Sequence, residues 1–173
     1  MSVVYRTYCR KAPKHRSMKR LVGSRFNKPV GGLWGCRGDE WIDWCIDNDF
    51  SLNKWREGFE WTLKPEARLL TVRSVSGFKK LIDKYSNPVG NLLEIDYLKI
   101  AKSYDAIELT SEPVYELSCG FDYIEHNISV DKYINKQVLY RLGTASWDVP
   151  SICVFRPNKV DIVRTFKNEK KGN

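Results

Sequence analysis

The sequence predicts a single-domain α+β protein, with one domain spanning residues 1–173. A chain of this length usually forms one domain, and folding buries roughly 70% of its unfolded surface, so stability needs neither a disulfide nor a metal. The composition, 42% hydrophobic and 29% charged, excludes disorder for most of the chain. The expected strands and helices do not alternate regularly, which argues against a doubly wound parallel sheet.

The first half of the chain is expected to contain three strands and one helix. Residues 3–8 are rich in β-branched and aromatic side chains, which favour a strand, whereas residues 11–29 have no consistent period and are expected to form a loop or a short helix. Residues 39–48 should form a helix capped by its first aspartate, because tryptophan and cysteine recur there at helical spacing. The other two strands are expected at residues 59–63 and 67–72.

The second half is expected to contain two helices and three strands. Apolar residues from Phe78 to Tyr85 repeat at i, i+3, i+4 and i+7, which is typical of an amphipathic helix, and Asp96 should cap the next helix. Residues 111–146 give no clear pattern. The expected elements are helices around residues 79–84 and 96–104 and strands at 106–110, 151–155 and 160–166, the last two separated by a turn at 156–158.

Positive charge is concentrated at the N-terminus. The first 38 residues contain 10 lysines and arginines and no acid, although the whole chain has a net charge of only +8. The rest of the chain therefore has a net charge of −2. This basic segment, at about residues 9–30, should attract phosphate backbones or an acidic protein face, or else serve as a solvated arm.

The cysteines and histidines do not predict a metal site. The five cysteines lack CxxC spacing, and His15 and His126 are the only histidines, so no zinc site can be assembled from local pairs. Cys36 follows a glycine turn but has no evident histidine partner, so a small buried thiol is the simpler expectation. The chain also lacks the GxGxxG, GxxxxGK[ST], GxSxG and HExxH motifs. Free thiols and the absence of long apolar runs favour a protein of the reducing cytoplasm that does not enter a membrane.

Three separated segments bring a cation, an aromatic surface and a carboxylate into the candidate site. They are Tyr5-Arg6-Thr7, the GGLWGC stretch at residues 31–36, and WDVPSICVFRPNKV at residues 147–160. In this order the sequence resembles the ADP-ribosyltransferase superfamily, and especially its small phage-encoded members, which include anti-CRISPR proteins. The resemblance implies a split β-sandwich with flanking helices, NAD as substrate and no metal.

The resemblance also implies roles for individual residues. Arg6 would bind the phosphate or ribose of NAD, and the backbone of Thr7 would hold the nicotinamide amide. The strand under the nicotinamide would be formed by Gly32, Leu33 and Trp34, with Trp34 as a stacking face. Two further positions carry over: Cys36 stands where many relatives have a small residue, and Asp148 stands in place of the catalytic acid.

The identity of the acid stays open at this point. Most of the superfamily uses Glu, and an overlay on the late strand of the poly-ADP-ribose polymerases would put Ser151 in that position. Glu108 is a second strand carboxylate that could act instead. Each residue also has a plain structural explanation, with Arg6 as one of many basic residues, Trp34 as core and Asp148 as a turn residue.

We therefore expect an NAD-dependent mono-ADP-ribosyltransferase of phage or prophage origin, acting in the host bacterial cytoplasm. Its acceptor would be a nucleic acid or a nucleic-acid-binding protein, because the basic segment suits such a partner. Two alternatives remain: a non-enzymatic inhibitor or nucleic-acid-binding protein on the same fold, and an NAD glycohydrolase toxin.

Overall fold

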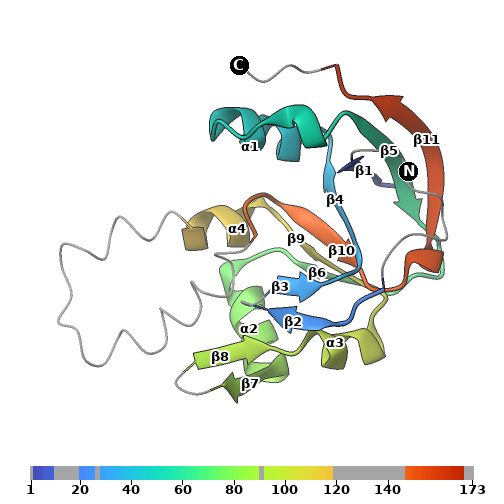
Figure 1. Cartoon of the computed structure of the whole chain (residues 1–173). Coiled ribbons are helices and arrows are strands. Elements are labelled where there is room, and N and C mark those ends of the chain that lie inside the picture. The colour runs from blue at the N-terminus through green and yellow to red at the C-terminus, as the bar shows by residue number, and fades with distance from the viewer. Residues whose placement is uncertain (1, 10–19, 26–27, 90–91, 119–146, 170–173) are drawn as a thin grey trace, which may run out of the picture.

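A seven-stranded sheet forms the centre of the computed structural model (Figure 1). The structure describes residues 2–9, 20–25, 28–89, 92–118 and 147–169. In spatial order the strands are β11 (Val160–Lys167), β5 (Glu57–Leu63), β1 (Val4–Cys9), β4 (Leu33–Arg37), β10 (Ser151–Val154), β9 (Ala106–Leu109) and β6 (Leu69–Val72). The β6–β9 pair is parallel and the other pairs in this sheet are antiparallel.

Helices and two small hairpins surround this sheet. The helices are α1 (Glu40–Asp47), α2 (Val75–Tyr85), α3 (Tyr97–Ser103) and α4 (Ser111–Ser118), with short 3-10 turns η2 (Leu52–Lys54) and η3 (Pro157–Lys159). The hairpins are β2 (Gly23–Arg25) with β3 (Lys28–Val30), and β7 (Ser86–Val89) with β8 (Leu92–Ile95). The mixed α+β class is thus confirmed. In the described part of the chain, no helix combines the length and apolar character needed to cross a bilayer.

Most of the expected elements are confirmed. The main differences are the two hairpins and helix α4, which begins the stretch that gave no clear pattern. Residues 11–29 were expected to form a loop or a short helix, but residues 23–25 and 28–29 belong to a hairpin, while 11–19 and 26–27 lie outside the described residues. Strands of three or four residues are too short to show alternation, so tertiary contacts decide their conformation. Here the Ser24 hydroxyl donates to the Ile95 carbonyl at 2.6 Å and accepts the Tyr97 N–H at 3.2 Å.

Strand β4 belongs to two half-sheets. Its C-terminal part pairs with β1, where Cys36 lies opposite Arg6, and its N-terminal part pairs with β10, where Gly35 lies opposite Ile152. Beyond this point β1 separates from β4. The Thr7 hydroxyl bridges the gap, since it donates to the Trp34 carbonyl and accepts the Trp61 indole N–H, the latter at 2.9 Å.

Three apolar clusters hold the half-sheets and helices together. One cluster joins side chains of β1 and β5, including Tyr5 and Trp61, to side chains of β9 and β10, including Ile152. A second cluster packs α2, α3 and α4 against β6, β9 and β10. The third packs α1 and η2 against β1 and β4, with Ile42 and Cys45 fully buried. The two half-sheets therefore share β4 and an apolar core.

Gly35 lies where the two half-sheets part. A Cβ atom added there would stand 2.6 Å from Cζ2 of Trp61 and 3.1 Å from the carbonyl oxygen of Arg6. Trp61 is fully buried and stacks on Tyr5 at a ring-centroid distance of 5.0 Å, so it has no room to move aside. Only glycine lets the indole lie across β4.

We expect Gly35→Ala to destabilise the protein by about 1–3 kcal/mol, because the added methyl overpacks the contact with Trp61. The matched control is Gly23→Ala, where an added Cβ meets no atom within 4 Å and the change should stay within about 0.5 kcal/mol. Urea unfolding monitored by circular dichroism measures both. Equal midpoints for the two variants would contradict this role of Gly35.

Candidate functional site

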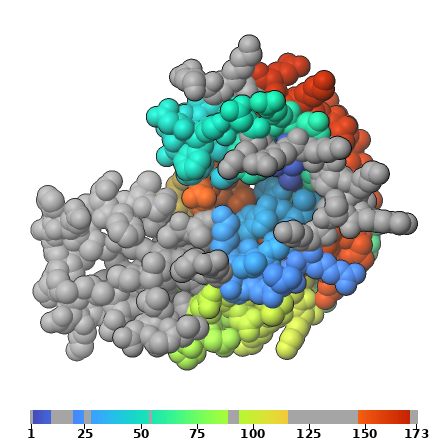
Figure 2. Space-filling view, in the orientation of Figure 1, coloured from blue at the N-terminus to red at the C-terminus, as the bar shows by residue number. Residues whose placement is uncertain are grey.

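A pocket of about 320 Å³ opens where the two half-sheets separate. Figure 2 shows the hollow beneath α1, with atoms of β4 and β10 at its base. Of the residues that the sequence singled out, six line this pocket: Arg6, Thr7, Trp34, Cys36, Asp148 and Ser151. The three segments that carry the family resemblance are thus brought together at one place.

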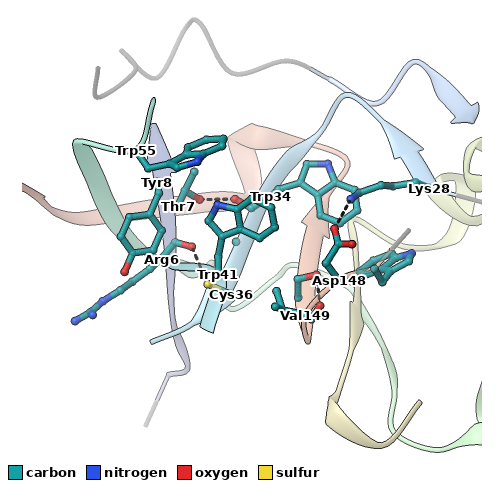
Figure 3. Close-up of a pocket in the computed structure, with 13 residues that line it drawn as sticks. Arg6, Thr7, Tyr8, Lys28, Trp34, Cys36, Trp41, Trp55, Asp148 and Val149 are labelled. Carbon is teal, nitrogen blue, oxygen red and sulfur yellow. Dashed lines mark hydrogen bonds and ion pairs between the residues drawn. The ribbon is translucent and has the colours of Figure 1, made fainter. Parts of the chain in front are cut away.

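Four tryptophans, called here the pocket tryptophans, line the cavity: Trp34, Trp41, Trp55 and Trp147. The rings of Trp34 and Trp147 lie 4.9 Å apart, centroid to centroid, and those of Trp41 and Trp55 lie 5.8 Å apart and almost perpendicular. Trp34 lies on β4 and Trp147 precedes β10, whereas Trp41 lies on α1 and Trp55 directly follows η2. Figure 3 labels Trp34, Trp41 and Trp55. Apolar walls of this kind suit a planar ring, which gains stacking and burial together.

A carboxylate and an ammonium group face each other beside Trp34. Asp148 lies three residues before the start of β10, and its Oδ2 is 3.8 Å from Nζ of Lys28, on β3. The same Nζ lies 5.0 Å from the centroid of the Trp34 ring, a cation–π distance. About a third of each of the two charged side chains is exposed, so a ligand can reach both groups. The long ion pair is weak enough for either group to exchange partners.

Arg6 forms a different set of contacts from the one expected. Its guanidinium pairs with Asp39 and, at 2.9 Å, with Glu60, and Figure 3 shows it pointing away from Trp34. Partial burial alone would lower the pKa of Arg6, but the hydrogen bonds to Asp39 and Glu60 raise it well above its usual value. The Arg6 side chain lines one wall of the pocket, and its charge is already neutralised by two carboxylates.

Asp39 precedes α1, as expected, but its carboxylate does not cap the helix. It instead accepts hydrogen bonds from Arg6 and from the Tyr8 hydroxyl. Glu60 binds Arg164 as well, at 2.6 and 2.9 Å, and these hydrogen bonds together with those from Arg6 hold the pKa of the Glu60 carboxyl below its usual value. This network connects the start of α1 to β1, β5 and β11. Its members are Arg6, Tyr8, Asp39, Glu60 and Arg164.

Cys36 lines the pocket as an unactivated thiol. The residue is 3% exposed, and burial raises the pKa of its thiol to about 11. Weak contacts join Sγ to the carbonyl oxygens of Arg6 and Gly38, at 3.9 and 3.7 Å. At neutral pH the thiol stays protonated, which agrees with the expectation of a buried cysteine rather than a nucleophile.

Gly32 and Leu33 do not line the pocket, although the resemblance implied that they lie under the ligand. Gly32 has φ of 75°, and a Cβ there would stand 2.6 Å from Sγ of Cys153, so it forms the tight turn into β4. The Leu33 side chain is buried in the core between the half-sheets, near Tyr5. Alternation along the strand accounts for this difference, because Leu33 and Trp34 must point to opposite faces.

Glu108, the alternative acid, lies outside the aromatic pocket. It is 4% exposed on β9 and accepts hydrogen bonds from Arg37, at 2.7 and 3.0 Å, and from the Tyr5 hydroxyl, at 3.1 Å. These residues line a separate cavity of about 60 Å³. Ser151 borders both cavities, and its hydroxyl donates to the Val149 carbonyl at 3.0 Å. The geometry therefore favours Asp148 over Glu108 as the carboxylate of the pocket.

The sequence did not single out Lys28, Trp41, Trp55 and Trp147 for this site. The spacing of Trp41 predicted one face of an amphipathic helix, and Trp147 stood first in the third segment without a role. Lys28 is one of the ten basic residues among the first 38, so only the hairpin distinguishes it. His15 and His126 lie outside the described residues.

Comparison of the chain with protein-family models, with curated proteins and with solved structures gives no match. Among the described residues, no three histidine, cysteine, aspartate or glutamate side chains are grouped so that they could hold a metal ion.

We expect Cys36 to resist alkylation by iodoacetamide at pH 7.5 in the native protein, because burial keeps its thiol protonated and covered. Peptide mapping by mass spectrometry measures the modified fraction, and the same protein in denaturant gives the reference for full reaction. Equal rates in the native and denatured protein would contradict the assignment of Cys36 as an inert thiol.

We expect Glu60→Gln to lower the melting temperature at neutral pH, because Arg6 and Arg164 lose their shared carboxylate. The folded-state pKa of Glu60 is lowered from its ordinary 4.5, so its contribution to stability is present above that value and is lost as the pH falls through the folded-state pKa. The difference from wild type should therefore shrink in acid.

Thermal unfolding between pH 3 and pH 8 tests this dependence. Asp83→Asn, which removes an exposed carboxylate on α2, is the control and should behave like wild type. A Glu60→Gln difference that grows as the pH falls would contradict the assigned direction of the pKa shift.

Proposed function

We propose that the protein is an NAD-dependent mono-ADP-ribosyltransferase that transfers ADP-ribose to a macromolecular acceptor. The observation that carries the proposal is the aromatic pocket beside β4, where the two half-sheets separate. It gathers Thr7, Trp34 and Asp148 from the three segments on which the family resemblance rests. Phage or prophage origin and action in a bacterial cytoplasm rest on the resemblance alone.

The fold is compatible with this proposal. We propose that the two half-sheets joined by β4 form the split β-sandwich of an ADP-ribosyltransferase. The shared core around Tyr5, Trp61 and Ile152 supports this, because it packs one half-sheet against the other. The pocket then lies at the split, where main-chain groups of β1 and β4 are not used in the sheet ladder.

The chemistry of the pocket residues suits cleavage of the nicotinamide–ribose bond. The aromatic walls would hold the nicotinamide ring, so that it leaves with the electrons of the C1′–N bond. Positive charge develops at C1′ as that bond breaks, and the carboxylate of Asp148 would stabilise it more strongly in the transition state than in the ground state. A nucleophile of the acceptor then bonds to C1′ and loses a proton. Lys28, rather than Arg6, is the cation free to exchange its partner for a phosphate.

The acceptor that the sequence suggested is a nucleic acid or a nucleic-acid-binding protein. This part of the proposal rests on the basic segment at about residues 9–30, of which 10–19 lie outside the described residues. Lys28 is one member of the segment that the structure puts at the pocket.

We expect saturable NAD binding in a calorimetric titration of the wild-type protein. Trp34→Ala should weaken binding by about tenfold, because a stacking face is lost. Asp148→Asn should leave binding nearly intact and slow nicotinamide release from NAD by about 10²-fold or more, since it removes charge stabilisation that matters in the transition state.

The matched control is Asp161→Asn, on β11, whose carboxylate is 62% exposed and distant from the pocket lining. It should match wild type in both assays. No NAD binding at millimolar concentration, or unchanged nicotinamide release in Asp148→Asn, would overturn the enzymatic proposal.

A second candidate is a non-enzymatic binding protein that uses the same pocket. The contacts of Arg6 favour it, because its guanidinium is bound to Asp39 and Glu60 and a diphosphate would have to displace them. In that case Asp148→Asn would retain the full biological effect, whereas Trp34→Ala would lose it.

A further inference from the structure

The region from residue 38 to residue 53 is acidic in a basic protein. It contains five carboxylates and no lysine or arginine, although the whole chain has a net charge of +8. Helix α1 forms half of this segment and lies at the surface, above the hollow in Figure 2. Asp43, Asp47 and Asp49 are exposed. A negative field of this kind repels phosphate and attracts cations.

A continuous row of aromatic rings runs along the same segment. It starts at Trp55 and Trp41 in the pocket wall, whose centroids lie 5.8 Å apart, and continues through Trp44, at 5.3 Å from Trp41, to Phe50, at 5.1 Å from Trp44. Trp44 is half-buried and Phe50 is 56% exposed. The row therefore leads from the pocket to the protein surface.

The C-terminal end of α1 is electrostatically unfavourable for the folded chain. The carbonyl end of a helix carries partial negative charge, yet Asp47 is the last residue of α1, Asp49 comes just after the C-cap Asn48, and the last turn has no basic residue. Asp49 also has φ of 55°, a conformation that glycine or asparagine adopts more readily. Both features cost stability in the isolated protein, and a cation bound at this end would offset the part that comes from charge repulsion.

We infer that the C-terminal end of α1, together with Trp44 and Phe50, is a docking surface for an arginine-rich segment of a partner protein. A guanidinium can stack on an aromatic face while it pairs with a carboxylate, and this surface offers both next to helix carbonyls. This inference goes beyond the proposed function, because it does not require NAD to bind. If the protein is a transferase, a segment docked here lies next to Trp41 and thus at the edge of the pocket.

An arginine–serine repeat peptide is the probe, with a glutamate–serine repeat and a single-stranded DNA oligonucleotide as comparisons. In calorimetry at low ionic strength, the arginine peptide should bind saturably at this surface, whereas the two comparison probes should not bind there. Binding of the arginine peptide should weaken as salt is added. The double variant Asp47→Asn/Asp49→Asn should weaken it by about three- to tenfold, and Phe50→Ala should act in the same direction. Asp83→Asn, on α2 at the opposite end of the molecule in Figure 1, should have no effect.

Thermal unfolding distinguishes a docking role of the two aspartates from a purely structural role. If the aspartates only stabilised the fold, the double Asn variant would melt below the wild-type temperature. The double Asn variant should melt at the same temperature as wild type or higher, because it relieves repulsion at the helix end while binding is lost. The inference is overturned if the arginine peptide does not bind, if both variants keep wild-type affinity, or if they lose DNA binding instead. Failure of NAD binding with normal peptide binding would remove the enzymatic proposal and leave this surface standing.

Discussion

The architecture depends on β4 being shared between two half-sheets that separate on either side of Gly35. Main-chain hydrogen bonds to β1 end at Arg6, and those to β10 begin at Gly35, so the sheet opens at this point. Trp61 covers the opening from the core side, where its indole N–H donates to the Thr7 hydroxyl. On the other side, residues of α1 and β3 border the pocket. The site is a consequence of how the sheet is built.

The walls of the pocket are positioned by a polar network whose charged groups are already paired with one another. Asp39 binds Arg6 and Tyr8 immediately before α1 begins, and this fixes the helix that carries Trp41. In the same network, Glu60 accepts a hydrogen bond from Arg6. Removing one partner of a partly buried ion pair of this kind leaves the other charge uncompensated, which lowers stability. The aromatic walls and the pair of Lys28 and Asp148 are what remain for recognition.

Much of the fold could be predicted from the sequence, because strong periodicity and clear caps mark its longer elements. The helix that buries Phe78 and Tyr85, and the helix that Asp96 caps at the Lys99 N–H, follow from local pattern alone. The hairpins could not be predicted, because their strands of three or four residues depend on contacts such as that of Ser24 with Ile95.

The candidate site was predictable in its chain segments but not in its chemistry. Motif order led to Trp34 and Asp148, which do meet in the pocket. The commitment of Arg6 to two carboxylates, and the separation of Leu33 from the cavity, depend on tertiary pairing that spacing does not encode. Trp147 could have been predicted as a pocket residue, because it directly precedes Asp148 in the sequence.

The most direct test of the account follows the tryptophan indole N–H signals by NMR during a titration with NAD. The chain has six tryptophans, and four of them line the pocket, so each signal reports on a known position. The signals are assigned with Trp→Phe variants. We expect the signals of the four pocket tryptophans to shift saturably, and by more than those of Trp44 and Trp61. Unchanged indole signals at millimolar NAD, or shifts confined to Trp44 and Trp61, would contradict the claim that the ligand site lies where the two half-sheets separate at β4.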